Sequence, residues 1–314
     1  MAACSQQAPA PPPLPNEILF VRGSAGLQAI EVRDGTVAAD LGQRKLAARL
    51  SPAGGVAEAY LVDRELAAVE MGRPIQVTRL VELAASVRDA ALLPAPGLKN
   101  YVGEATVVIV SGADGVDRAF QHGRPLWSRN LGSMRFVGDL ALARASDGAW
   151  LLVAPETGEP TFASQTCTPG PVAQELGGRP LFDCSGEQPP WWLRAADGPG
   201  LFVQPNGDLI RPETPIDRPR LLGRLPQLPA GRPALSPDGT HVYAPASDGV
   251  IDQRIGGASS MLERPATSAV GMSRDGRFLY VLGGGALDVY DASSHSHRAG
   301  YAVDGVSIEL VAAG

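Results

Sequence analysis

Histidine, a residue type that commonly carries catalysis, occurs only four times in this chain of 314 residues. A histidine-dependent mechanism would have to use His122, His241, His295 or His297. His295 and His297 flank a single serine, a spacing that could chelate a metal ion, but they follow a predicted strand, which favours a solvated loop instead. His241 falls inside a predicted strand, and we expect it to lie on the face of a sheet.

Asp-Gly pairs are a second recurring feature with possible chemistry. Several carboxylates that converge on one face can bind calcium. Most of these pairs, however, stand where a hairpin requires a tight turn, so we interpret them as structural. The aspartates concerned are Asp114, Asp147, Asp197, Asp238, Asp248, Asp275 and Asp304.

The motifs of common enzyme sites are missing from the sequence. It contains no serine nucleophile elbow, no phosphate-binding glycine loop and no zinc-ligand spacing. We therefore predict no catalytic residue and no resident cofactor, and we leave a divalent cation such as calcium as the alternative.

Two adjacent tryptophans, Trp191 and Trp192, follow a pair of prolines. Large aromatic side chains dominate the energetics of many interfaces, so the pair could form an exposed anchor for a partner. The alternative is that the two rings fill a gap between neighbouring sheets.

The composition indicates which elements must position these side chains. The 37 glycines and 28 prolines are spread along most of the chain, which implies frequent turns and many short strands. A net charge of -6 argues against nucleic-acid binding, which requires a clustered basic face. No apolar run is long enough to span a bilayer as a helix.

An internal repeat is the main signal of the fold. The segment Ala234 to Tyr243 matches Gly271 to Tyr280, about 40 residues further along, and each reads as a strand, a tight Asp-Gly turn and a second apolar strand. A third copy begins at Leu50 and runs into Tyr60. With three weaker copies, the expected turn glycines are Gly54, Gly97, Gly148, Gly198, Gly239 and Gly276.

A seventh copy is split between the two ends of the chain. The segment from Tyr301 to Val311 supplies a first strand, and Glu17 to Val21 supplies a second strand that lacks a predecessor. Pairing of these segments would close a ring without an exposed sheet edge.

The strong copies resemble the YVTN-type propeller repeat, which is related to the WD-repeat and quinoprotein propellers. Leu27 to Val37 and Ala286 to Ser293 fit the strand and turn that follow the Asp-Gly hairpin in this family. The resemblance implies an all-β, seven-bladed β-propeller with four-stranded blades over residues 16–314. The middle blades, from about residue 90 to 225, depart from the pattern, so six or eight blades remain possible.

One segment favours a different local structure. Between Leu80 and Leu93, apolar residues recur at helical spacing, which could indicate a short helix instead of strands.

The first fifteen residues form a proline-rich tether that resembles the cleavage end of a bacterial lipoprotein signal. Small residues precede Cys4 there, so the resemblance implies a lipid on Cys4; if Met1 is the native start, the segment is a disordered tail. Once Cys4 is assigned, Cys167 and Cys184 remain. They could form a disulfide in an oxidising compartment, or they are two unrelated buried thiols.

We therefore expect a protein outside the cytoplasm, anchored through its N-terminus. Its predicted role is that of a non-enzymatic scaffold or accessory subunit that binds another protein or a cell-envelope component, with membrane contact only through the lipid. The alternative is a lactonase-like hydrolase with carboxylates or a divalent cation at the central channel, because propellers host both kinds of function.

Overall fold

The computed structural model describes residues 13–313 except for 51–55, 96–104, 138–139, 145–149, 164–190, 194, 196–199 and 214–217. Within these residues every regular element is a β-strand, and the strands form seven four-stranded antiparallel sheets. No helix in the described residues could cross a membrane. The prediction of an all-β chain built from four-stranded units is confirmed.

The sheets follow the chain, with one exception at its ends. The exceptional sheet has the order β28 (Ser307–Ala313), β1 (Glu17–Gly23), β2 (Gly26–Glu31) and β3 (Val37–Gly42). The next three sheets are β4 (Lys45–Leu50), β5 (Val56–Val62), β6 (Glu65–Glu70) and β7 (Gln76–Glu82); β8 (Val87–Pro94), β9 (Thr106–Gly112), β10 (Asp117–Gln121) and β11 (Arg124–Arg129); and β12 (Met134–Val137), β13 (Leu140–Arg144), β14 (Trp150–Val153) and β15 (Pro160–Ala163). The last three are β16 (Trp191–Leu193), β17 (Leu201–Val203), β18 (Asp208–Glu213) and β19 (Arg218–Arg224); β20 (Ala234–Leu235), β21 (His241–Ala246), β22 (Gly249–Arg254) and β23 (Ser259–Glu263); and β24 (Thr267–Met272), β25 (Phe278–Gly283), β26 (Ala286–Asp291) and β27 (His297–Ala302).

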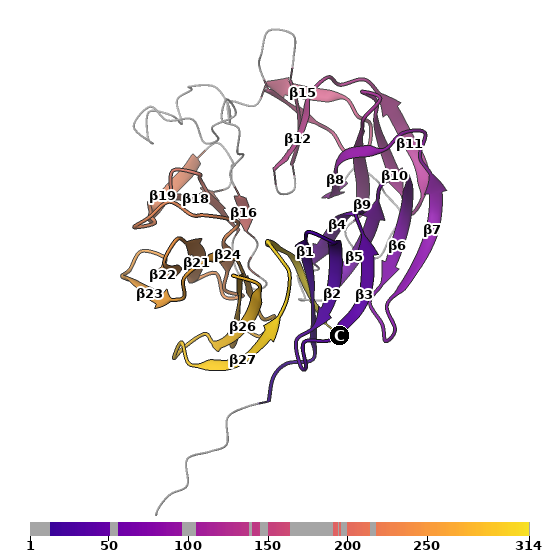
Figure 1. Ribbon diagram of the computed structural model, residues 1–314. Helices are drawn as coiled ribbons and strands as arrows, with labels where there is room; N and C mark the ends of the chain where they lie inside the picture. Colours follow the sequence, from indigo (N-terminus) through magenta and orange to yellow (C-terminus); the bar gives the residue numbers. More distant parts are fainter. Residues whose placement is uncertain are drawn as a thin grey trace, which may run out of the picture.

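Figure 1 shows the sheets succeeding one another around a common centre. Apolar side chains pack between the faces of neighbouring sheets, as in the cluster of Leu19, Ile30, Phe278 and Leu282, which joins the β28–β3 sheet to the β24–β27 sheet. Corresponding clusters join five further pairs of neighbours. The core is therefore divided among the interfaces between sheets, as expected when both faces of a sheet are covered.

Exposure increases outward from the second strand of each sheet. The second strands are almost fully buried, as β9 and β25 illustrate, whereas the fourth strands β7 and β11 expose most of their side chains. The first strands face the centre and carry the residues that are discussed below as a site.

The repeated turns have the predicted conformation in the two strong copies. Gly239 and Gly276 have φ angles of 70° and 73°, and each donates its backbone N–H to a serine carbonyl three residues earlier, at 2.9 Å. These are left-handed conformations that glycine adopts without strain. The predicted glycines at 54, 97, 148 and 198 lie outside the described residues.

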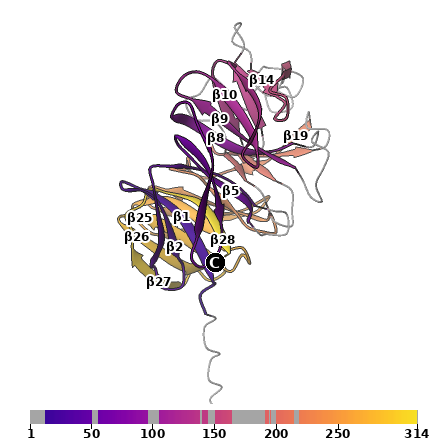
Figure 2. The ribbon, with the colours of Figure 1, turned by 90° about the vertical axis from the view of Figure 1, so that its right-hand side faces the viewer.

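The two ends of the chain share one sheet. β28 pairs antiparallel with β1, with Val311 opposite Leu19 and Ile308 opposite Val21, and the two strands lie side by side in Figure 2. The predicted pairing of the terminal strands is therefore present. Glu17 extends this contact, since its carboxylate accepts hydrogen bonds from the Tyr280 hydroxyl and the Arg274 backbone of the adjacent sheet.

Two details of the sequence analysis are wrong. The segment with helical spacing forms strands β7 and β8, because Leu92 and Leu93 are buried against neighbouring sheets while Leu80 lies exposed on an outer strand. The weak copy at Ser146 to Gly148 was aligned incorrectly: the strands that flank it, β13 and β14, are the second and third of their sheet, whereas the turn in the strong copies joins the first and second.

Candidate binding site

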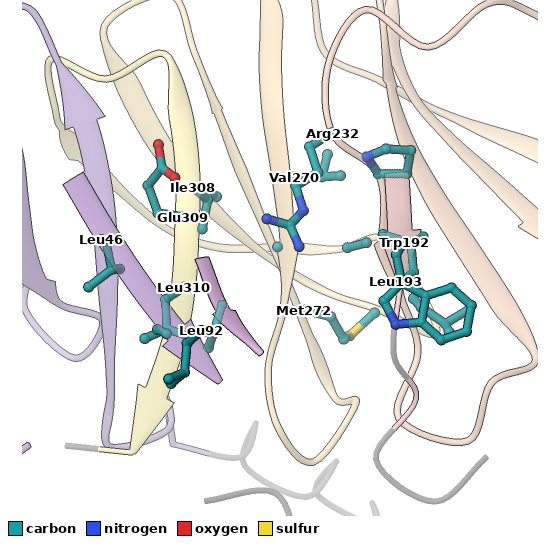
Figure 3. Close-up of a pocket in the computed structure, with 16 residues that line it drawn as sticks. Leu46, Leu92, Trp192, Leu193, Arg232, Val270, Met272, Ile308, Glu309 and Leu310 are labelled. Atoms are coloured by element: carbon teal, nitrogen blue, oxygen red, sulfur yellow. The ribbon is translucent and has the colours of Figure 1, made fainter. Parts of the chain in front are cut away.

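Two adjoining cavities of about 310 and 830 Å³ lie at the centre of the molecule. Their linings share Leu46, Leu92, Trp192, Arg232 and Glu309, so they form one continuous space. The wall comes from the first strands of separate sheets, β4, β8, β12, β16, β20, β24 and β28. Figure 3 shows the smaller cavity between β28 and β16. A space of this size is typical of sites for small ligands.

Trp191 and Trp192 lie on the first strand of their sheet and line the larger cavity. Trp192 contacts the ring of Phe202 on the paired strand, with ring centroids 4.4 Å apart and planes inclined by 42°. Trp191 packs against the apolar cluster between its sheet and the β20–β23 sheet. Both side chains are partly buried. The structure thus places the pair on the central wall, where the sequence analysis had considered an exposed anchor or a filler between sheets.

The indole of Trp192 brings an unused hydrogen-bond donor to this wall. Its Nε1 atom is buried and has no hydrogen-bond partner among the described residues. A buried N–H without a partner costs free energy, which the packing of the indole ring must offset.

Five charged side chains also line the larger cavity: Arg22, Lys45, Asp89, Arg232 and Glu309. Arg22 and Glu309 form an ion pair with a distance of 3.1 Å between Nε and Oε1. The same Oε1 accepts a hydrogen bond from Ser307 at 2.8 Å, and Arg22 donates to the Arg44 carbonyl at 3.0 Å. Each member of this ion pair therefore makes one further hydrogen bond.

The other three charged groups, Lys45, Asp89 and Arg232, form no ion pair with another described residue. Removal from water raises the pKa of Asp89, a backbone hydrogen bond from Ala90 opposes that rise, and the positive charge of Lys45 also opposes it. Partial removal from water lowers the pKa of Arg232, and the negative charge of Glu309 acts to raise it. The Arg232 side chain is nevertheless exposed to the cavity. The side chains of both Asp89 and Arg232 are exposed and line the space at the centre.

The four histidines lie near carboxylates and away from this cavity. His241 and His295 both contact Asp252, at 2.7 and 3.2 Å, and His295 reaches it from the neighbouring sheet. His297 contacts Asp288 at 3.0 Å, and His122 lies 3.5 Å from Glu58. His295 and His297 thus contact different carboxylates instead of sharing a position.

The described Asp-Gly aspartates of the strong repeats act within their own turns. Asp238 accepts hydrogen bonds from Ser236 at 2.6 Å and from the Thr240 backbone at 3.1 Å. Asp275 makes the equivalent contact with Ser273 at 2.7 Å. In the part of the chain that the structure describes, no group of three or more His, Cys, Asp or Glu side chains is arranged to hold a metal ion.

Cys4, Cys167 and Cys184 lie outside the described residues, so lipidation and the disulfide stay predictions. The sequence analysis missed Arg22, Lys45, Asp89, Arg232 and Glu309. One signal was available: Glu309 is a charged residue within Ser307 to Val311, a predicted first strand that faces the centre of a propeller. Arg232 and Lys45 carry no comparable sequence signal, because each stands next to ordinary turn residues.

Comparison with known proteins supports the architecture. No family model and no curated protein match the chain. Among solved structures, apo AztD from Citrobacter koseri aligns over 94% of this chain and 97% of its own, with 12% identity and a TM-score of 0.50. BamB from Moraxella catarrhalis aligns over 94% and 92%, with 13% identity and a TM-score of 0.47. AztD is a β-propeller protein, and at this identity the likeness concerns the fold alone: the chain has a propeller-type fold.

Proposed function

We propose that this chain is a non-enzymatic binding protein of the cell envelope, a seven-bladed propeller of YVTN type whose central cavity receives an envelope component. In this proposal residues 16–314 form a single domain, and residues 1–15 tether it to the membrane through a lipid on Cys4. It acts outside the cytoplasm, as a scaffold or as an accessory subunit of a larger assembly.

The observation that carries the proposal is the construction of the cavity. Strands from separate sheets form its wall, so the cavity exists only when these sheets are packed around it. Aromatic rings and charged groups share that wall, and such a mixture of apolar surface with a few polar groups is typical of binding sites. The pairing of β28 with β1 supports a closed ring, since it leaves β1 without a free edge.

The cavity can be blocked without changing its charges. Ala48 lies on β4, is partly buried and lines both cavities, so Ala48→Trp would fill part of the space. Ala38 lies exposed on the outer strand β3, and Ala38→Trp is therefore the matched control.

The test is native mass spectrometry of the protein released from its own envelope with a mild detergent. We expect a bound component with the wild type and with Ala38→Trp, and its loss with Ala48→Trp. Retention of the same component by Ala48→Trp would refute a role for the cavity. The mass of the N-terminal peptide from the same preparation tests the tether, because acylation of Cys4 adds a lipid mass, and an unmodified Cys4 would refute the anchor.

A further inference from the structure

Arg232 has no partner among the described residues, in contrast to Arg22 and Arg264. Arg22 pairs with Glu309, and Arg264 bonds to Asp288 at 2.7 Å and to the carbonyl groups of Gly283 and Ala286 at 2.8 and 3.2 Å. For Arg232, the described residues provide neither a hydrogen bond nor an ion pair. Its guanidinium has five N–H donors, so a considerable capacity for hydrogen bonding is directed at the cavity.

Glu309 does not serve as that partner. The negative charge of Glu309 favours the charged form of Arg232, but its Oε1 atom is engaged by Arg22 and Ser307. In Figure 3 the guanidinium of Arg232 projects into the space between the strand that carries Glu309 and the strand that carries Trp192. A bound anion would supply the partner that the guanidinium of Arg232 lacks among the described residues.

The charges of the whole cavity act in the same direction. Three cationic groups, Arg22, Lys45 and Arg232, face two carboxylates, Asp89 and Glu309, whereas the protein as a whole carries a net charge of -6. The described charged residues of the cavity wall thus carry a net positive charge, which favours anions over cations at this wall.

From these contacts we infer that the central cavity binds a small organic anion, whose carboxylate pairs with Arg232 and whose flat apolar part lies against Trp192. The inference rests on the proposed function and names the chemical class of its ligand. Guanidinium groups bind carboxylates through two parallel hydrogen bonds, and the Trp192 side chain lines the same cavity. The volume of about 830 Å³ accommodates a ligand of this kind.

Three probes that share one ring system and differ in charge test the inference: 2-naphthoate, 2-naphthylmethanol and 2-naphthylmethylammonium. Their binding to the full chain is measured by isothermal titration calorimetry at low ionic strength. We expect the wild type to bind the anion most tightly and the cation most weakly. Arg232→Gln should weaken binding of the anion about ten- to a hundredfold and leave the alcohol unchanged, because a hydrogen bond to a charged group is lost.

Further variants separate charge, geometry and stacking. Arg232→Lys keeps the charge but loses the planar fork, so its affinity for naphthoate should fall between those of the wild type and Arg232→Gln. Trp192→Leu should weaken all three probes. Arg33→Gln, an exposed substitution in the turn between β2 and β3, is the matched control and should change none of them. Because Arg232 has no partner, its variants should unfold at the wild-type temperature.

The possible failures are distinguishable. Equal affinity of Arg232→Gln and the wild type for naphthoate would overturn the assignment of Arg232. Equal affinity of the wild type for all three probes would overturn the preference for anions while leaving the cavity as a binding site. If none of the probes binds and Ala48→Trp retains the envelope component, both the inference and the proposed function fail.

Discussion

Replacing Tyr280 with phenylalanine would remove one hydroxyl group from the interface between the β24–β27 sheet and the β28–β3 sheet. Tyr280 is fully buried, and its hydroxyl donates a hydrogen bond to the carboxylate of Glu17, which is 6% exposed. The other oxygen of that carboxylate accepts the Arg274 backbone N–H at 2.9 Å. Since phenylalanine keeps the ring, the substitution isolates the hydrogen bond between the sheets.

The magnitude follows from the charge of the acceptor. A hydrogen bond to a charged group contributes about 1.5 to 3 kcal/mol to stability, and one between neutral groups about 1 kcal/mol. Burial raises the pKa of Glu17 above its usual value, and the hydrogen bonds from Tyr280 and Arg274 lower it, with burial the larger effect. Tyr280→Phe removes one of the lowering contacts, so the destabilisation should be about 2 kcal/mol at about pH 8 and fall to about 1 kcal/mol at about pH 4, where the carboxyl group is protonated.

Urea denaturation of both proteins at the two pH values measures this difference. Tyr301→Phe is the matched control, because the Tyr301 hydroxyl donates to the neutral carbonyl of Val32 at 2.8 Å across the same pair of sheets. Its loss should cost about 1 kcal/mol at both pH values. An effect of Tyr280→Phe below about 0.5 kcal/mol, or one that is equal at both pH values, would refute the reasoning.

Three further predictions concern turns and ion pairs. The stability of Glu17→Gln relative to the wild type should increase between about pH 4 and about pH 8. The pKa of Glu17 is raised in the folded state, so the stability that the protonated carboxyl group contributes to the wild type is lost as the pH rises through that value. A difference in stability that stays constant with pH in denaturation experiments would contradict this. Gly239→Ala should cost about 1 kcal/mol in urea denaturation, since the φ of 70° disfavours a Cβ, whereas Gly72→Ala, at a position with space for a methyl group, should cost less than half as much. Arg264→Met should cost about 3 kcal/mol, because it leaves two carbonyl groups without their donor and leaves Asp288 only its contact with His297. Arg79→Met removes two ion pairs at the surface, with Glu65 and Glu82, and should cost less than about 1 kcal/mol, so equal midpoints for these two variants would count against the network.

The fold was readable from the sequence where local chemistry determines local structure. The Ser236 and Ser273 turns depend on a serine, an aspartate and a glycine within a few residues, so each copy carries its own signal. The strand at Ser307 to Ala313 was identified because its counterpart near Leu19 lacked a preceding strand. Such reasoning fails between Leu80 and Leu93, where contacts with neighbouring sheets override the helical spacing.

The candidate site could be predicted only in part, because it belongs to no single repeat. Trp191 and Trp192 stood out by residue type, yet their position on the central wall follows from the place of β16 as the first strand of its sheet. Arg232, Lys45 and Glu309 are far apart in sequence and come together only when different sheets face one centre. Their importance depends on which charges lack partners, and sequence spacing carries no information on that point.

The pairing of β28 with β1 has a consequence for how the protein is made. β1 leaves the ribosome before the strand that covers its edge, because residues of the two strands that contact one another, such as Arg22 and Glu309, stand 287 positions apart in the chain. Throughout that interval the apolar β1 segment keeps a free row of backbone donors and acceptors, which is the kind of surface that other chains can join. The newborn chain therefore needs protection at the edge of β1 until β28 has been made.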